Sequence, residues 1–269
     1  MSSNLCGYNT CPQKITEILD RIVNFFSTIL EDNLIGIYLH GSLAMDCFNP
    51  VKSDIDLIII VNNELNLQVK KQLIKESVDI SDLEFFPQKG LEYSIILQKY
   101  LQPFIHPTPF ELHFSGCWKE KFREGYIEGI QPPTDRDLAA HLMVTYQRGI
   151  CLFGESIKKV IPKINHEEYI DALFYDFDDY QETIITDSVY SILNSCRILY
   201  YFREKAIASK LEGGLWAKEE LEPQYIPLIS EAINVYSNKT PKFNISDVLL
   251  RDFYNYISKL ILSEKEKAF

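Results

Sequence analysis

The chain has 269 residues, 46% of them hydrophobic, and a formal net charge of −11 at pH 7. This length and apolar content suit one large domain or two modest ones with a real core. A nucleic-acid-binding protein normally presents a basic face. No cluster of Lys and Arg predicts one here, so we expect no nucleic-acid partner, and an acidic surface instead suits a cationic small substrate.

The six cysteines are scattered without the spacing of a metal site. We interpret them as reduced thiols of a cytoplasmic protein. No apolar run is long enough to span a bilayer, and no basic stretch followed by an apolar one predicts a signal peptide. We therefore expect a cytoplasmic monomer without a membrane partner.

The first predicted elements are a helix and a strand. Apolar residues recur at helical spacing over residues 12–32, which predicts an amphipathic helix. The β-rich run Leu34–His40 predicts a strand. Gly41-Ser42 then opens a short helix that we expect to continue to Phe48.

The second predicted strand, Ile55–Val61, opens on two carboxylates. Asp54 and Asp56 stand at i and i+2, so both side chains point to one face of a strand. Neighbouring carboxylates repel each other unless a cation lies between them, and Mg²⁺ prefers carboxylate and phosphate oxygens. Backbone N–H groups at the Gly41-Ser42 turn can hold a phosphate. A lone Asp-x-Asp is common without metal, but this combination predicts a metal-dependent phosphoryl or nucleotidyl transfer site.

A third carboxylate lies on the next predicted strand. We expect a helix over residues 62–75, turns over 77–90 and a strand over Leu91–Leu97. Glu92 interrupts this otherwise apolar or β-branched strand. An isolated Glu more often lies on a solvated strand face. Its position one strand after the Asp pair favours a base that accepts the proton of an attacking hydroxyl.

The rest of the chain becomes increasingly helical. Residues 110–118 predict a further strand and residues 119–130 a polar connection. A helix is predicted over residues 135–150, with Thr134 as its N-cap. After Pro162, apolar stripes predict helices over residues 169–186, 188–205, 222–236 and 246–265.

These elements predict an α+β fold. A mixed sheet flanked by helices occupies residues 1–160, and an all-helical domain occupies residues 161–269. Taken alone, the stretch around Lys210, Ser-Lys-Leu-Glu-Gly-Gly, is typical of a solvated loop, and Arg197 could be a salt-bridged surface residue.

The strand, Gly-Ser turn and Asp-x-Asp together resemble the signature of the nucleotidyltransferase superfamily of DNA polymerase β. From about residue 30 onward, the chain resembles the aminoglycoside adenylyltransferases that inactivate streptomycin and spectinomycin. The matching residues are Gly41-Ser42, Ser53-Asp-Ile-Asp-Leu57, Leu91-Glu92, Phe110-Glu-Leu-His-Phe-x-x-x-Trp118, Asp137-Leu-Ala, Leu152-Phe-Gly154, Leu193-x-x-x-Arg197-Ile-x-Tyr200, Lys210, Trp216-Ala217, Pro223-Gln-Tyr225 and Tyr236.

The resemblance implies a nucleotidyltransferase domain followed by the helical domain, with ATP as co-substrate. It implies that Asp54 and Asp56 hold two Mg²⁺ ions, and that Glu92 is the catalytic base and also contacts the drug. It assigns nucleotide-binding roles to Ser42, Ser53, Arg197, Lys210 and Tyr236. For the cationic drug, it implies contacts from Trp118 and Asp187.

One position departs from the family pattern. Members that take streptomycin carry a second acid about one helical turn before the equivalent of Asp187, where this chain has Thr183. Glu182 or Asp179 could substitute. We therefore predict AMP transfer to spectinomycin first and to streptomycin second.

Two alternatives stay open. The first is a nucleotidyltransferase for another acceptor, such as a lincosamide or a protein side chain. The second is a nucleotide-binding regulator without catalysis, although the intact Asp54, Asp56 and Glu92 argue against it.

Overall fold

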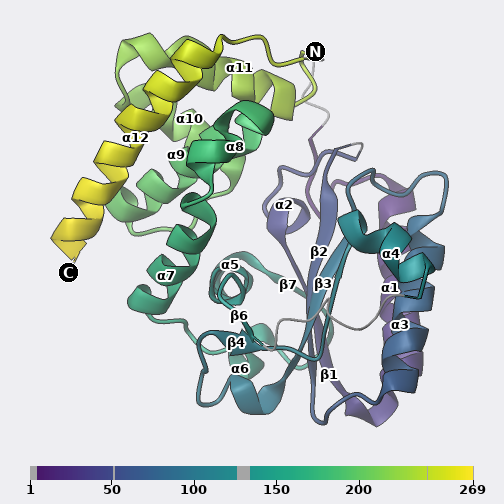
Figure 1. Ribbon diagram of the computed structural model, residues 1–269. Helices are drawn as coiled ribbons and strands as arrows, with labels where there is room; N and C mark the ends of the chain where they lie inside the picture. The colour runs from purple at the N-terminus through teal and green to yellow at the C-terminus, as the bar shows by residue number, and fades with distance from the viewer. Residues whose placement is uncertain (1–4, 51, 126–133, 241, 269) are drawn as a thin grey trace. The chain divides into compact units, whose positions relative to one another are not determined.

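The computed structural model describes residues 5–50, 52–125, 134–240 and 242–268. The chain forms two compact units, Leu5–Ala172 and Leu173–Phe269 (Figure 1). This division falls within α7 (His166–Phe177), later in the chain than the predicted boundary after residue 160. Within the described part of the chain, no helix is both long and apolar enough to cross a membrane.

The first unit is built on a five-stranded sheet with the order β5-β3-β2-β1-β7. Strands β2 and β3 are parallel, whereas the other neighbours are antiparallel, so the sheet is mixed as predicted. A separate two-stranded pair joins β4 and β6. The strands are β1 (Leu34–His40), β2 (Asp54–Val61), β3 (Gly90–Leu97), β4 (Thr108–Pro109), β5 (Leu112–Ser115), β6 (Thr134–Asp135) and β7 (Ile150–Gly154).

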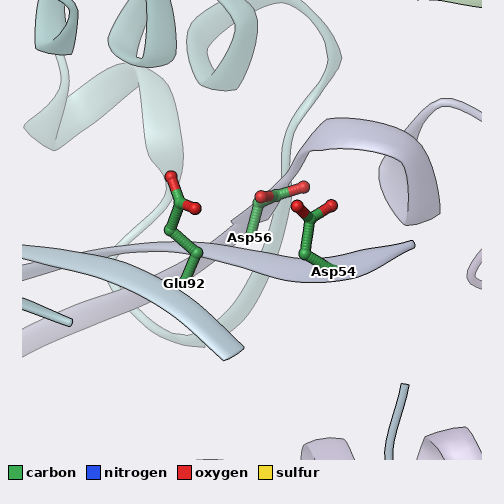
Figure 2. Close-up of side chains that lie close together, drawn as sticks. All are labelled: Asp54, Asp56 and Glu92. Carbon is green, nitrogen blue, oxygen red and sulfur yellow. The ribbon is translucent and has the colours of Figure 1, made fainter. Parts of the chain in front are cut away.

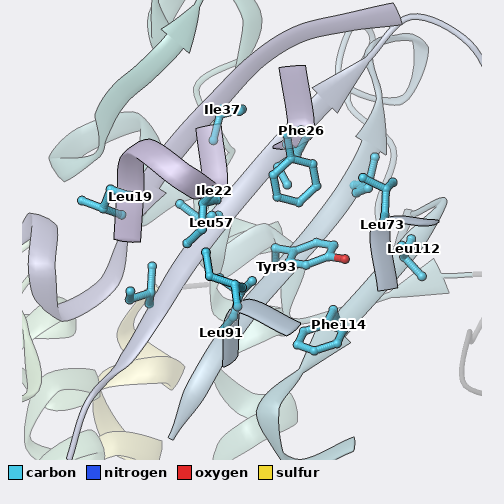
Figure 3. Packing of buried hydrophobic residues seen from close by; sticks show 14 of the residues in the cluster. Leu19, Ile22, Phe26, Ile37, Leu57, Leu73, Leu91, Tyr93, Leu112 and Phe114 are labelled. Carbon is cyan, nitrogen blue, oxygen red and sulfur yellow. The ribbon is translucent and has the colours of Figure 1, made fainter. Parts of the chain in front are cut away.

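One face of the sheet carries the apolar core of this unit. Leu39, Leu57, Tyr93 and Phe114 pair in one row across four strands, and all are buried. The apolar sides of α1 (Gln13–Leu30) and α3 (Leu67–Ser81) belong to the same buried cluster, which Figure 3 shows. Burial of such side chains stabilises the fold by about 1.5–3 kcal/mol each. This apolar face therefore holds the sheet against α1 and α3.

The neighbouring row is polar. His40, Asp56, Glu92 and Ser115 are paired across β1, β2, β3 and β5. Because successive residues of a strand point to opposite faces, this row lies on the face away from the apolar core. Helix α5 (Leu138–Arg148) packs on β1 and β2 and lies on the opposite side of the sheet from α1 and α3 (Figure 1).

Helix α2 (Gly41–Ala44) is shorter than predicted. It was expected to continue to Phe48, but Asp46 has a positive φ of 56°, which a helix cannot include. Phe48 instead forms an isolated bridge with Cys6. The segment after the Gly-Ser turn is therefore held by the start of the chain.

Helix α3 is displaced along the sequence from its predicted range of 62–75. The Asn66 side chain accepts a hydrogen bond from the Val69 N–H at 3.0 Å, so the helix begins after this cap. It continues to Ser81, through residues predicted as turns, because Val78 and Ile80 are buried in the core.

The region after β5 also differs from the prediction. The predicted polar connection begins with a short helix, α4 (Lys119–Arg123), and residues 126–130 lie outside the described residues. Thr134 was predicted to cap α5, but it belongs to β6, and Asp137 occupies the N-cap position.

Strand β7 was not predicted from the sequence. Gly154 has a φ of +86°, and a Cβ there would lie 2.0 Å from the Ile35 carbonyl oxygen. The glycine is therefore needed for close pairing of β7 with β1. A single helical turn, α6 (Ile157–Val160), follows.

The second unit is helical, as predicted, and α9 lies at its centre. Helices α8, α10, α11 and α12 all contact α9, and most of its residues are buried. The single helix predicted over residues 169–186 is two helices, α7 and α8. The bounds are α8 (Tyr180–Thr186), α9 (Ser188–Glu204), α10 (Lys210–Glu220), α11 (Ile226–Tyr236) and α12 (Asp247–Ala268).

Helix α10 was not among the predicted helices, and its first residues, taken alone, are typical of a solvated loop. Ser209 and Glu212 form a reciprocal capping box at its start, which satisfies two backbone N–H groups. The two glycines that suggest a loop face inward: a Cβ on Gly213 would lie 2.7 Å from the Arg197 Cα of α9. The glycines thus allow two helix backbones to pack closely.

This packing predicts that Gly213→Ala destabilises the protein. Alanine normally favours a helix over glycine by about 1 kcal/mol, but the added Cβ would collide with the α9 backbone. We expect a net loss of about 1–2 kcal/mol in the free energy of unfolding, measured by chemical denaturation. Leu215→Ala is the matched control, since Leu215 lies on the same helix with 48% of its surface exposed. A Gly213→Ala protein as stable as the parent would contradict the packing account.

Candidate active site

Three carboxylates converge on the polar face of the sheet. Asp54 and Asp56 come from β2 and Glu92 from β3, and one ligand oxygen from each lies within 4.8 Å of the others. Figure 2 shows the three side chains rising from the same side of the two strands. The parallel register that pairs Asp56 with Glu92 produces this convergence.

The three carboxylates suit a divalent cation. All three are half-buried, and like charges this close repel each other unless a proton or a cation offsets them. An all-oxygen donor set with room for phosphate and water is what Mg²⁺ requires.

Gly41 is required at the edge of this cluster. Its φ is +65°, and a Cβ there would lie 1.8 Å from Asp56 Oδ2. Any other residue would both strain the backbone and displace the carboxylate. The glycine of the Gly-Ser turn therefore makes room for the Asp56 carboxylate.

Ser42 and Ser53 occupy different positions near the carboxylates. The Ser42 Oγ is buried and has no hydrogen-bond partner among the described residues, which is costly unless a ligand or water supplies one. The Ser53 Oγ accepts from the Asn49 N–H at 3.0 Å, and this bond helps close the loop that leads to Asp54. The Ser53 hydroxyl still has a proton to donate.

The far side of Glu92 meets β5. Ser115 Oγ lies 3.5 Å from Glu92 Oε2 and 3.2 Å from the sulfur of Cys117. Trp118 follows at the end of a single 3₁₀ turn and packs partly against the apolar core. The Lys121 ammonium lies 3.9 Å from the centre of the Trp118 ring, so this ring already carries a cation on one face.

A layer of histidines beside Glu92 was missed by the sequence analysis. His141 of α5 lies 3.1 Å from Asp137 Oδ2, and its ring centre lies 5.1 Å from that of His40. Burial alone would lower the pKa of His141, but the carboxylates of Asp137, Glu92 and Asp135 raise it to about 10. The i, i+4 spacing of Asp137 and His141 on a helix was the available signal.

The other two histidines of this layer are neutral. Burial, followed by the charge of His141, lowers the pKa of His40. The same two causes lower the pKa of His113 to about 4, and His113 Nδ1 lies 3.0 Å from Ser94 Oγ. His141 is therefore the cation of the three at neutral pH.

The predicted nucleotide-binding residues of the helical unit lie on three helices that pack together. Arg197 is on α9, Lys210 begins α10 and Tyr236 ends α11, and both α10 and α11 contact α9. The Lys210 ammonium lies 4.5 Å from the centre of the Tyr190 ring, and Tyr190 lies two turns before Arg197 on α9. Lys210 therefore lies against the same helix that carries Arg197.

Asp176 organises the same region and was not singled out from the sequence. It accepts hydrogen bonds from the Tyr190 hydroxyl at 2.9 Å and from Asn194 Nδ2 at 2.6 Å, and also from Tyr180. This shared acceptor ties α7 to α9. It also fixes the Tyr190 ring that lies beneath Lys210.

The two predicted drug-binding acids of the helical unit, Glu182 and Asp187, are exposed. Asp187 joins α8 to α9 and makes no side-chain cap bond, and Glu182 lies in the first turn of α8. Thr183 Oγ1 lies 3.1 Å from the Asp179 carbonyl oxygen and 3.2 Å from Ser191 Oγ. The hydroxyl at the position that departs from the family pattern is therefore already engaged within the helices.

Two family models match the chain in its two parts. The nucleotidyltransferase domain matches residues 19–108, and the C-terminal domain of aminoglycoside adenylyltransferases matches residues 159–259. The first match contains all three clustered carboxylates, and the second contains Arg197, Lys210 and Tyr236.

Relatives match the chain over most of its length. A spectinomycin 9-adenylyltransferase of Campylobacter jejuni is 26% identical over 85% of this chain and 86% of its own length. An aminoglycoside (3'')(9) adenylyltransferase of Klebsiella pneumoniae is 26% identical over 91% of this chain and 94% of its own. The fold resembles that of the spectinomycin adenyltransferase AAD(9) of Enterococcus faecalis, solved with ATP and spectinomycin, with a TM-score of 0.78 and 23% identity over 91% of this chain and 98% of the other.

The close approach of Gly41 to Asp56 predicts that Gly41→Ala weakens metal binding. The added Cβ would displace the Asp56 carboxylate, so we expect Mn²⁺ affinity to fall about tenfold or more in titration calorimetry. Ser42→Ala is the matched control in the same turn, because it leaves both carboxylates in place. Equal Mn²⁺ affinity in Gly41→Ala and the parent would exclude Asp56 as a ligand held by this turn.

Proposed function

We propose that this chain, which belongs to the family of aminoglycoside adenylyltransferases, transfers AMP from ATP to a hydroxyl of spectinomycin. The convergence of Asp54, Asp56 and Glu92 within 4.8 Å is the observation that carries the proposal. It provides metal ligands and a base at one point on the sheet. The relative named as a spectinomycin 9-adenylyltransferase supports the choice of acceptor.

The reaction requires one proton transfer and one displacement at phosphorus. The acceptor oxygen bonds to the α-phosphorus, the bond from that phosphorus to the bridging oxygen breaks, and pyrophosphate leaves with its electron pair. Glu92 takes the proton of the acceptor hydroxyl. Two Mg²⁺ ions bound by Asp54 and Asp56 would offset the charge of the triphosphate and of the leaving pyrophosphate.

Residues of the first unit would also position the phosphates. The unpartnered hydroxyl of Ser42 and the remaining proton of Ser53 are donors suited to phosphate oxygens. Ser42 lies at the start of α2 and Ser53 directly before β2. Both positions are next to the proposed metal ligands.

The helical unit would contribute the remaining nucleotide contacts. Arg197 and Lys210 are suited to the triphosphate, because their charges oppose those of its phosphates. Tyr236 would lie against the nucleotide. These roles are supported by the family match over residues 159–259.

Recognition of the acceptor would depend on aromatic and acidic side chains. Trp118, Asp187, Glu182 and Glu92 suit an amine-bearing sugar through cation–π contact and ion pairing. Thr183 supplies no carboxylate, and its hydroxyl is engaged with Asp179 and Ser191. This favours spectinomycin over streptomycin. We further propose a cytoplasmic monomer that uses cellular ATP and has no nucleic-acid partner.

The direct test is incubation of the purified protein with ATP, Mg²⁺ and either drug, followed by mass spectrometry. We expect spectinomycin to gain one AMP and streptomycin to react more slowly or not at all. If neither spectinomycin nor streptomycin is modified, the substrate assignment is wrong. ATP binding without turnover of any acceptor would favour a nucleotide-binding regulator, and turnover of a lincosamide or a protein would favour another acceptor.

Glu92→Gln separates catalysis from nucleotide binding. The amide cannot accept the acceptor's proton, so we expect the rate of AMP transfer to fall about 100-fold or more, while the affinity for ATP in calorimetry changes little. Ser94→Ala, on the same strand and facing His113, is the matched control. A Glu92→Gln enzyme with nearly full activity would exclude the carboxylate as the base.

A further inference from the structure

Trp118 is tied to the strand that carries Glu92. It ends the single 3₁₀ turn after β5, and Ser115, the last residue of β5, pairs with Glu92 of β3. Gly116 in that turn packs closely against the chain directly before β3, because a Cβ there would lie 2.2 Å from the Lys89 carbonyl oxygen. The Trp118 ring also packs partly against the apolar core. Its position is therefore set by the sheet.

Lys121 of α4 lies over this ring. Its ammonium is 3.9 Å from the centre of the Trp118 ring, well within the limit of about 6 Å for a cation–π contact. In the part of the chain that the structure describes, Lys121 forms no ion pair with a carboxylate. The aromatic ring is therefore the group that this lysine contacts.

The rest of α4 keeps Lys121 in this place. Lys119 and Arg123 both form ion pairs with Asp82, at 3.0 Å and 2.5 Å, and Asp82 directly follows α3. Phe122 is buried in the apolar core. These contacts fasten α4 to the end of α3 and to the core, so its remaining lysine stays beside Trp118.

We propose that Lys121 is a specificity-determining residue, which covers one face of Trp118 and thereby disfavours acceptors that would stack a guanidinium on that ring. The proposal rests on the proposed function, in which Trp118 contacts the acceptor. A planar guanidinium stacks on an aromatic face, whereas an ammonium is a compact, strongly hydrated charge. Streptomycin, which carries guanidinium groups, therefore loses more from a covered ring than spectinomycin, whose cations are amines.

The covered ring opposes a guanidinium on either face. On the face that Lys121 covers, the guanidinium must displace the ammonium, and the existing cation–π contact is lost. On the other face, it meets a ring that already interacts with one cation, and the two like charges repel each other. Lys121 thus acts in the same direction as Thr183, which supplies no carboxylate.

The test compares Lys121→Gln with Lys119→Gln by titration calorimetry of each drug in the presence of Mg²⁺ and a non-hydrolysable ATP analogue. Both variants remove one positive charge from α4, but only Lys121→Gln uncovers the Trp118 ring. We expect the affinity for streptomycin relative to that for spectinomycin to rise about two- to fivefold in Lys121→Gln. The ratio should stay near that of the parent in Lys119→Gln, and also in Lys121→Arg, which keeps a cation over the ring.

Two results would overturn the proposal. Equal gains in affinity for both drugs in Lys121→Gln would show a general effect of charge. An unchanged or lower affinity for streptomycin in Lys121→Gln would show that the lysine only supports the ring.

Fluorescence separates this proposal from the proposed function. The chain has two tryptophans, so in a Trp216→Phe background the emission comes from Trp118. Quenching by acrylamide, which is uncharged, should rise in Lys121→Gln and stay unchanged in Lys119→Gln. Equal quenching in the two variants would refute the covering of the ring, whereas a parent protein that modifies neither drug would refute the proposed function.

Discussion

The first unit holds the carboxylates of Asp54, Asp56 and Glu92 within 4.8 Å of one another, although three carboxylates this close repel each other. The sheet register brings the three together, and the apolar row on its other face fixes that register, because a slip of one residue would expose Leu57 and Tyr93. Gly41 gives the Asp56 carboxylate room. On the polar face of the sheet, α5 packs over β1 and β2 and carries His141. Core packing, the Gly-Ser turn and α5 therefore all hold an arrangement that a bound cation would complete.

In the helical unit, the backbones of α9 and α10 pack closely against each other. Gly213 lets α10 approach α9 next to Arg197, and the capping box fixes the start of α10, where Lys210 lies. Asp176 holds the Tyr190 ring beneath that lysine. The positions of Arg197 and Lys210, two cations suited to a triphosphate, thus depend on the close contact at Gly213 and on the hydrogen bonds that Asp176 accepts.

Much of the first unit follows from its sequence, because strong apolar runs and the Asp-x-Asp spacing report local structure. The bounds of β1, β2 and β3 were predicted to within a residue. The exceptions were long-range effects: β7 depends on pairing with β1, α10 on inward-facing glycines, and the extension of α3 on burial of Val78 and Ile80. The three carboxylates were predicted from spacing along neighbouring strands. The histidine layer was not, because His40, His113 and His141 come together only when α5 lies over the sheet.

Crystals grown with Mn²⁺ and a non-hydrolysable ATP analogue would test the central claim most directly, through the anomalous scattering of manganese. The account predicts manganese peaks within bonding distance of the carboxylate oxygens of Asp54 and Asp56. Nucleotide bound with no metal on the Asp pair would contradict it.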